Sequence, residues 1–252
     1  MKRQVPFQLI YEDDYIAAVS KISGLSVGPD RWEESKERLD KLLAAFLKLE
    51  RIYTVHRIDK DTSGLVVFAK DERTHKRLSA AIESRQVEKR YIAAVHGRPL
   101  WTETVCDLPL VPNGNKLHHT IIDKYQGKKS LTRFTLLVSA GNYSILEARP
   151  ETGRTHQIRV HLASLGHPVV CDELYGSMKP VLLSSIKRSW RGDPLEERPL
   201  LARLGLHAAE LLLPPYRPEQ NGEDAGKGPG LKAPLPRDMA ALMTQMEKAA
   251  RY

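Results

Sequence analysis

The N-terminal part of the chain consists of short apolar runs separated by charged breaks. Two apolar runs between Phe7 and Val19 flank the acidic segment 12–14, which predicts two short strands joined by a turn. Between residues 37 and 50 leucines recur at helical spacing, and this pattern predicts an amphipathic helix packed on a core. Residues 65–68 are apolar without a break, which predicts a short buried strand.

Helical and extended patterns then follow one another along the middle of the chain. Residues 72–85 predict a second helix with a basic exposed surface, and residues 90–95 predict another strand. Residues 133–138 and 143–147 predict two strands of a hairpin around the turn 140–142. Because strands and helices are mixed without a regular βαβ alternation, a doubly wound parallel sheet is not expected.

The C-terminal part contains two further predicted helices. Thr155 is the expected N-cap of a helix over residues 155–165, because Gly166 and Pro168 follow it. A final helix is expected over residues 238–251. Surface loops are expected where the sequence is polar, basic or rich in proline and glycine, over residues 184–198 and 214–236.

Composition and charge narrow the class of protein. The 252 residues are 41% hydrophobic and 28% charged, which is typical of a folded globular chain. The net charge of +8 suits a polyanionic partner such as nucleic acid. No stretch reaches the ~18 apolar residues that span a bilayer. With two cysteines and no secretion signal, a disulfide framework is not expected, and the chain is expected in a reducing compartment, the cytoplasm or an organelle interior.

The first cluster of chemical side chains spans residues 56–64, His-Arg-Ile-Asp-Lys-Asp-Thr-Ser-Gly. A calcium loop is rejected, because Lys70 stands where the bidentate glutamate is needed. An aspartyl-phosphate phosphatase would use Asp59 as nucleophile and Asp61 as acid, but such a nucleophile follows an apolar strand and not His56 and Arg57. Two interpretations remain open from the residues alone: a carboxylate held ionised among cations, or a solvated charged turn.

Two further clusters carry basic residues and an aromatic. His156 and His161 lie about 140° apart on a helix, so they do not converge on one metal ion. Arg154 and Arg159 at the same predicted helix favour an anion or a carboxylate as partner. The segment 89–91, Lys-Arg-Tyr, places an aromatic between basic residues at the start of a strand, where it could stack on a nucleobase or pack in the core.

In this order the three clusters resemble the motifs of RluA-type pseudouridine synthases, within the RsuA/RluA superfamily. Residues 56–65 are similar to the family's His-Arg-Leu-Asp, two variable residues and Thr-Ser-Gly-Leu, with Ile58 in place of leucine. Residues 89–91 resemble its Lys-x-Tyr stretch, and residues 152–161 resemble Thr-Gly-Arg-x-His-Gln-Ile-Arg-x-His. Asp172 and Tyr175 follow as in the family. The segment 20–25 lacks the proline usual there, which concerns the choice of substrate.

The resemblance implies a fold, a reaction and partners. The implied fold is α+β, a mixed and largely antiparallel sheet split by a central cleft with flanking helices. Residues 1–252 are expected to form a single catalytic domain without a separate N-terminal RNA-binding domain. The implied reaction isomerises specific uridines of structured RNA, either tRNA or large-subunit (23S-type) rRNA or both, to pseudouridine after base flipping. No cofactor, metal or membrane is implied, and a cytoplasmic monomer is expected.

The resemblance also implies roles for individual residues. Asp59 is the implied essential carboxylate, which attacks the sugar, adds to the base or removes a ribose proton; these alternatives stay open. Tyr91 is expected against the target base, and Arg159 is expected to pair with Asp59. Residues expected to bind RNA are Arg57, which would enter the space left by the flipped base, and His56, Lys89, Arg154 and His156. Two other functions are also considered: a non-catalytic RNA-binding protein of the same fold, and the phosphatase, which would depend on magnesium.

Overall fold

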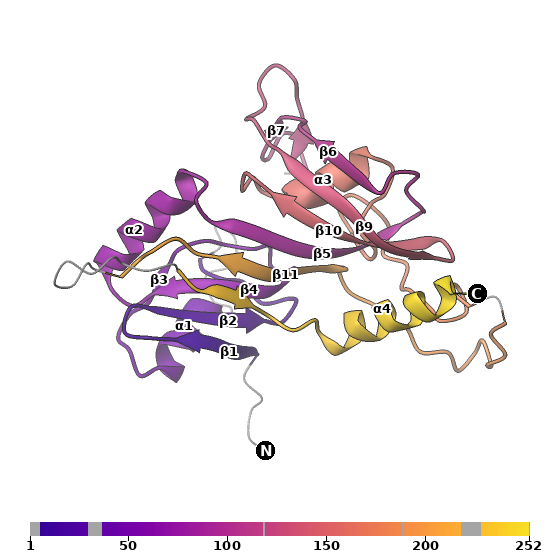
Figure 1. Ribbon diagram of the computed structural model, residues 1–252, viewed down its shortest axis with the longest axis horizontal. Coiled ribbons are helices and arrows are strands. Elements are labelled where there is room, and N and C mark those ends of the chain that lie inside the picture. The colour runs from indigo at the N-terminus through magenta and orange to yellow at the C-terminus, as the bar shows by residue number, and fades with distance from the viewer. Residues whose placement is uncertain (1–5, 30–36, 118, 188, 218–227, 252) are drawn as a thin grey trace. The chain divides into compact units, whose positions relative to one another are not determined.

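The computed structural model describes residues 6–29, 37–117, 119–187, 189–217 and 228–251. The chain forms two compact units (Figure 1). The first unit contains Met1–Lys89 and Ala208–Pro234, and the second contains Arg90–His207 and Leu235–Tyr252. Residues 218–227, within the predicted loop 214–236, lie outside the described residues.

In the part that the structure describes, the first unit contains a sheet with mostly antiparallel pairs and two helices. Its strands and helices are β1 (Phe7–Glu12), β2 (Ile16–Lys21), α1 (Leu39–Phe46), β3 (Tyr53–Thr54), β4 (Ser63–Ala69), α2 (Glu72–Glu83), most of β11 (Leu206–Leu212) and β12 (Gly230–Lys232). The strand order is β1-β2-β4-β11, with β3 paired to β4 and β12 paired to β11. The predicted strands on either side of the acidic turn are therefore confirmed as β1 and β2.

The strand β4 is the centre of this first sheet. All seven of its residues are buried, and β2 pairs with it in an antiparallel register that sets Lys21 opposite Gly64. Gly64 has φ +111°, and a Cβ there would lie 2.2 Å from the carbonyl oxygen of Ala208. A side chain at position 64 is therefore excluded both by the backbone angle and by the close approach of β11.

The second unit contains four longer strands, a small hairpin and two helices. Its elements are β5 (Glu88–His96), β6 (Glu103–Cys106), β7 (Leu110–Val111), β8 (Ile121–Ile122), β9 (Thr132–Ala140), β10 (Tyr143–Pro150), α3 (Gln157–Ser164) and α4 (Arg237–Ala250). β5, whose first two residues belong to the first unit, β10, β9 and β6 follow one another in an antiparallel sheet, and β7 pairs with β8 separately. α4 packs against β9 (Figure 1).

The predicted α+β class with largely antiparallel strands is confirmed by these elements. The hairpin around residues 140–142 is present, with Gly141 at φ +57°. The N-cap prediction is wrong, because α3 begins at Gln157 after His156, which has φ 53°. The side chain of Gln157 explains the difference, since its Oε1 accepts from Arg154 N at 3.0 Å and leaves no role for a Thr155 cap.

Two other findings bear on the composition. In the part of the chain that the structure describes, no helix is long and apolar enough to cross a membrane. Both cysteines, Cys106 and Cys171, are free thiols and are buried.

His56 extends the pairing of β3 with β4 by using its side chain. The backbone pairing of β3 with β4 ends at Thr54 and Phe68. The backbone amide of Val67, the residue before Phe68 in β4, donates to His56 Nε2 at 3.1 Å. A ring nitrogen that accepts this bond must be unprotonated, so the imidazole is neutral with its proton on Nδ1. Burial, with a contribution from the Lys89 ammonium group, lowers the pKa of His56 to about 4.

We expect this histidine to make the stability of the protein depend on pH. Between the unfolded pKa of about 6.5 and the folded pKa of about 4, only the unfolded chain takes up the proton, so stability is full above pH 6.5 and falls by about 3 kcal/mol as the pH drops to 4. His56→Gln keeps an acceptor for Val67 and should remove this part of the pH dependence in urea unfolding. His75→Gln is the control, because His75 Nε2 faces the carbonyl oxygen of Thr54 and accepts nothing there. An unchanged slope in His56→Gln would contradict the assignment.

Candidate functional site

Asp59 begins a tight turn that leads into β4. We call residues 57–62 the Asp59 loop. The Thr62 amide donates to the Asp59 carbonyl oxygen at 3.1 Å, which closes the turn, and aspartate is favoured at its first position. Asp59 is half-buried between the buried side chains of Ile58 and Thr62. The loop is therefore partly buried, and the interpretation as a solvated charged turn does not describe it.

Four of the basic residues singled out in the sequence belong to the same unit as Asp59. Arg57 and Lys60 in the loop are exposed. Lys89 is half-buried, and burial together with the neighbouring Arg85 lowers the pKa of its ammonium group. Lys89 also acts electrostatically on His56, so these two candidate RNA-binding residues lie close together. The neutral His56 contributes no positive charge, and only its Nδ1–H is a donor.

Tyr91 lies in the second unit, on β5, opposite Ala148 of β10. Its half-buried ring packs against a core of apolar residues that includes Ala93, Ile158 and Leu162. One face of the tyrosine is thus held by packing, and the strand pairing determines where the ring lies. The two interpretations of this residue, a core tyrosine and a stacking surface, are compatible in this position.

Arg159 is buried in an ion pair with Asp172. Arg159 Nε donates to Asp172 Oδ2 at 2.8 Å and Nη2 donates to Oδ1 at 2.7 Å, with both side chains 5% exposed or less. Burial alone would raise the pKa of Asp172, but the hydrogen bonds and the charge of Arg159, with the amides of Leu174 and Tyr175, hold it below its ordinary value. The carboxylate is ionised, and the plane of the guanidinium group is fixed.

Tyr175 connects this ion pair to His156. The Arg159 guanidinium lies over its ring, 5.2 Å from the centroid, and its hydroxyl lies 2.8 Å from His156 Nδ1. The Thr120 amide donates to the same hydroxyl at 2.9 Å. The Tyr175 hydroxyl therefore links the Thr120 backbone to the imidazole ring of His156. Burial raises the pKa of Tyr175, which keeps its hydroxyl protonated.

The N-terminal end of α3 is held by side-chain hydrogen bonds. The Thr152 hydroxyl donates to Gln157 Oε1 at 2.7 Å, and Gln157 Nε2 donates to the Leu131 carbonyl oxygen at 2.9 Å. Arg154 Nε reaches the Lys129 carbonyl oxygen at 3.3 Å. These bonds orient Arg154, His156 and Arg159 from one rigid helix start.

His161 is part of the interior of the second unit. Its Nε2 lies 3.0 Å from the Leu108 carbonyl oxygen, which only accepts, so its Nδ1 accepts from the Thr132 hydroxyl at 3.0 Å. Burial lowers the pKa of this neutral imidazole. Among the described residues no group of three or more His, Cys, Asp and Glu side chains is arranged to hold a metal ion.

The candidate residues fall into two sets. Asp59, Arg57, His56 and Lys89 belong to the first unit; Tyr91, Arg154, His156 and Arg159 belong to the second. Sequence reasoning gave no role to three residues that hold these sets in place: Lys21, Asp172 and Tyr175. Asp172 and Tyr175 follow the third motif in the sequence, and this position could have indicated their role. Lys21 lies in the segment 20–25, which was noted only for its missing proline.

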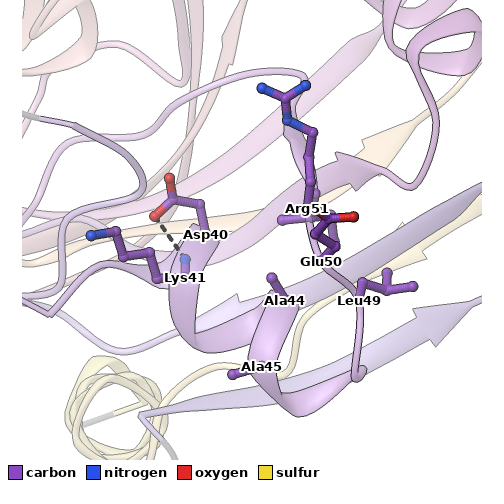
Figure 2. Close-up of a pocket in the computed structure, with 8 residues that line it drawn as sticks. Asp40, Lys41, Ala44, Ala45, Leu49, Glu50 and Arg51 are labelled. Atoms are coloured by element: carbon purple, nitrogen blue, oxygen red, sulfur yellow. Dashed lines mark hydrogen bonds between the residues drawn. The ribbon is translucent and has the colours of Figure 1, made fainter.

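A surface pocket on the first unit contains none of these residues. It has a volume of about 340 Å³ and is lined by α1 and the segment after it, including Lys41, Leu49 and Arg51 (Figure 2). Its carboxylate Asp40 accepts from the Lys41 amide at 2.8 Å (Figure 2). The Arg38 guanidinium group also donates to Asp40, at 3.0 Å. We assign no function to this pocket.

We expect loss of the Asp172 charge to destabilise the protein. In Asp172→Asn the buried Arg159 loses its counterion, and breaking a buried pair from one side costs about 3 kcal/mol or more. Asp238→Asn is a matched control, because Arg203 contacts Asp238 by the same two-bond geometry at 2.7 Å, with both side chains partly exposed. There the expected cost is about 1 kcal/mol or less. Equal losses in a urea unfolding series would show that burial is not what makes the Arg159 pair important.

Comparison with known proteins agrees with the motifs. Residues 15–164 match the model of the family described as RNA pseudouridylate synthase. Ribosomal large subunit pseudouridine synthase D of Zymomonas mobilis is 32% identical over 97% of this chain and 74% of its own length. Dual-specificity RNA pseudouridine synthase RluA of Vibrio vulnificus is 34% identical over 85% of this chain and 79% of its own length.

A solved structure supports the fold. Human RNA Pseudouridylate Synthase Domain Containing 4 superposes with a TM-score of 0.70 at 22% identity, covering 95% of this chain and 92% of that one. The likeness in structure shows the fold, and the family match with the identities above shows the relationship. The chain therefore belongs to the RNA pseudouridylate synthase family and is related to its RluA-type members.

Proposed function

We propose that this protein converts uridines of structured RNA into pseudouridine with Asp59 as the essential carboxylate. In this isomerisation the bond from ribose C1′ to uracil N1 breaks, the base rotates, and a bond from C1′ to C5 forms, while the proton of C5 is lost and N1 gains one. The observation that carries the proposal is the position of Asp59 in a closed, partly buried turn just before β4, within a first family motif that differs only by Ile58 in place of leucine.

Arg159 is proposed as the partner of the Asp59 carboxylate. This pairing follows from the family motif, and the geometry within the second unit supports the choice of residue. Asp172 occupies Nε and Nη2, and the Tyr175 ring lies against one face of the guanidinium group. An arginine held in this way loses little side-chain entropy when it receives a second carboxylate, and its positive charge favours the ionised form of that carboxylate.

Tyr91 and Arg57 are proposed to contact the flipped nucleotide and the place it leaves. A uracil within a stack must be extruded at a cost of a few kcal/mol, and contacts in the enzyme have to offset that cost. The packed ring of Tyr91 is a rigid surface for the base. Arg57 has an exposed guanidinium group, which is planar and can stack on the neighbouring bases and reach phosphates.

Exposed basic residues on both units are proposed to bind the RNA backbone. On α2 these include Arg73 and Lys76, whereas Arg77 also has a structural role, because it donates to the Tyr216 carbonyl oxygen at 3.1 Å. In the 184–198 loop they include Arg191 and Arg198. His56, Lys89, Arg154 and His156 are proposed to contact the RNA near the target, with the neutral His56 acting as a donor.

The substrate is proposed to be tRNA, large-subunit rRNA or both. The names of the relatives support this choice, since one is a large-subunit synthase and another is a dual-specificity enzyme. We propose that the protein acts as a monomer in the cytoplasm. Mapping pseudouridine in total RNA from cells with and without the gene identifies the substrate positions directly.

Replacing Asp59 tests the proposal. Asp59→Asn is isosteric but neither attacks a carbon nor takes a proton, so we expect turnover to fall about a thousandfold while RNA affinity stays within twofold. Asp61→Asn, an exposed carboxylate in the same turn, is the control and should retain activity. The assay follows pseudouridine in a purified reaction with chelator present. An active Asp59→Asn protein refutes the assignment, and in a separate assay magnesium-dependent hydrolysis of a phosphate ester that requires Asp61 would favour a phosphatase.

Salt dependence tests the proposed backbone contacts. RNA affinity should fall at least about tenfold between 50 and 200 mM salt, because phosphate contacts release counterions. Arg73→Ala with Lys76→Ala should reduce the slope of log Kd against log salt by about 1.4, or about 0.7 for each lost contact. Lys232→Ala is the control, since its ammonium group is paired with Glu210 at 3.2 Å. A flat titration would remove the case for these basic residues.

A further inference from the structure

Tyr175 is the point at which three segments of the second unit meet. The Arg159 guanidinium group lies over its ring, 5.2 Å from the centroid, and its hydroxyl lies 2.8 Å from His156 Nδ1. The same hydroxyl accepts from the Thr120 amide at 2.9 Å, and the His119 ring packs edge-on against the tyrosine ring, with the centroids 5.6 Å apart. One side chain therefore contacts two candidate residues at the start of α3 and the segment that leads into β8.

The Asp172 carboxylate places Tyr175 against Arg159. Its Oδ1 accepts from the backbone amides of Leu174 and Tyr175 at 3.0 and 3.2 Å, which forms a turn closed by an aspartate side chain. The same oxygen accepts from Arg159 Nη2 at 2.7 Å. Because one carboxylate holds both the guanidinium group and the backbone that carries the tyrosine, the ring and the guanidinium group have a fixed relation to each other.

The two segments that meet at Tyr175 each contain a residue in a strained backbone conformation. His156 has φ 53° and Cys171 has φ 55°, in the left-handed region that residues other than glycine rarely adopt. His156 is the last residue before α3, and Cys171 directly precedes Asp172. Such conformations persist only where surrounding contacts determine them, and they cluster at functional sites. The hydroxyl and the ring of Tyr175 supply two of these contacts to His156.

The Tyr175 ring restrains the Arg159 guanidinium group in a way that Asp172 does not. The carboxylate of Asp172 binds the group along two of its N–H bonds, whereas the aromatic ring attracts the cation through its π-face. Together the two contacts limit rotation of the guanidinium group. Arg159 therefore has one orientation before any RNA binds.

We propose that Tyr175 is a positioning residue for the reaction: its ring fixes the orientation of Arg159, and its hydroxyl fixes His156. The proposal rests on the proposed function, in which Arg159 pairs with the Asp59 carboxylate and His156 contacts the RNA. The two parts of the side chain then act on different steps, the ring on catalysis and the hydroxyl on RNA binding. A displacement of about 1 Å at a reacting group can cost on the order of 100-fold in rate.

Two substitutions separate these parts on an RNA that the wild type converts. Tyr175→Phe keeps the ring and loses the hydroxyl, so kcat should stay within about twofold while the RNA dissociation constant rises about fivefold. Tyr175→Leu also loses the ring, so kcat should fall at least about tenfold, with the dissociation constant of Tyr175→Phe. A purely structural role predicts lower urea midpoints with wild-type kcat and affinity for the folded fraction. Wild-type kcat in folded Tyr175→Leu overturns the proposal.

His156→Asn tests whether the hydroxyl acts through His156, because asparagine tolerates the left-handed conformation but lacks the imidazole ring. Adding Tyr175→Phe to His156→Asn should not weaken RNA binding further, since both changes remove the same contact. Losses that multiply in the double variant overturn this link. The binding measurement also decides the case in which Tyr175→Leu does not fold, because wild-type RNA affinity in Tyr175→Phe then overturns the proposal.

Tyr143→Phe is the matched control. Tyr143 is a half-buried tyrosine of the same unit and pairs with His96, at the other end of β5 from Tyr91. Its ring packs against His96, with the centroids 5.5 Å apart. Its kcat and RNA affinity should equal those of the wild type. Losses as large as in the Tyr175 variants would attribute the effect to any tyrosine of this unit and would overturn the specific role.

Amide exchange measured without RNA separates the proposal from the proposed function. The Thr120 amide bonds to the Tyr175 hydroxyl, and the Val160 amide bonds to the His156 carbonyl oxygen at 3.0 Å. Both amides should exchange at least about tenfold faster in Tyr175→Phe and at the wild-type rate in Tyr143→Phe. If this pattern is found but the wild type converts no RNA, the proposed function fails and the placement of His156 by Tyr175 stands. If exchange is unchanged, the proposal fails whatever the activity.

Discussion

The pairing of β2 with β4 is the constraint on which the first unit depends. β4 is buried along its whole length, so it cannot slide by one residue without turning every side chain to the other face. This register decides that Lys21 and Gly64 end the ladder together. Because the Asp59 loop leads into β4 at the end of that ladder, the strand register fixes where the loop enters the sheet.

The protein handles buried charge in two different ways. In the second unit Arg159 is matched by a carboxylate, and the pair is neutral as a whole. In the first unit the buried ammonium group of Lys21 donates to the carbonyl oxygens of Ile22 and Lys60. His56 follows a third pattern, since its Nε2 is held as an acceptor by the Val67 backbone amide. Its hydrogen-bonding role is thereby fixed without ionisation.

Much of the secondary structure followed from local patterns, and the reasons are visible in single elements. The hairpin of β9 and β10 was predicted because its turn and both strands lie within twenty residues, and α2 because its apolar stripe repeats at helical spacing. The strands β6, β7, β8 and β12 have four residues or fewer and depend on pairing with neighbouring strands, so no local sequence pattern predicts them. Thr155 is a good cap in isolation, but the side chain of Gln157 satisfied the same helix end.

Some residues of the candidate site were likewise predicted from the sequence, and others were not. Asp59, Tyr91 and Arg159 were identified through a family resemblance, since composition and spacing alone left a charged turn, a core tyrosine and a solvated arginine open. The residues that hold them were not predicted, because their contacts are distant in sequence: Asp172 lies 13 residues from Arg159, and Lys21 lies 39 residues from Lys60. A lysine at the end of a strand gives no sign in the sequence that its amine points inward.

The state of the two cysteines has a practical consequence for spectroscopy. Cys106 is 4% exposed, and Cys171, also 4% exposed, directs its Sγ at the carbonyl oxygens of Lys179 and Leu201. Burial raises the pKa of Cys171, so little of the reactive thiolate exists near neutral pH. A maleimide dye added to the native protein should therefore not react with either native thiol. A new cysteine at a solvent-exposed position such as Tyr125 or Leu195 would then carry the label alone, and single-label fluorescence becomes possible in the wild-type background.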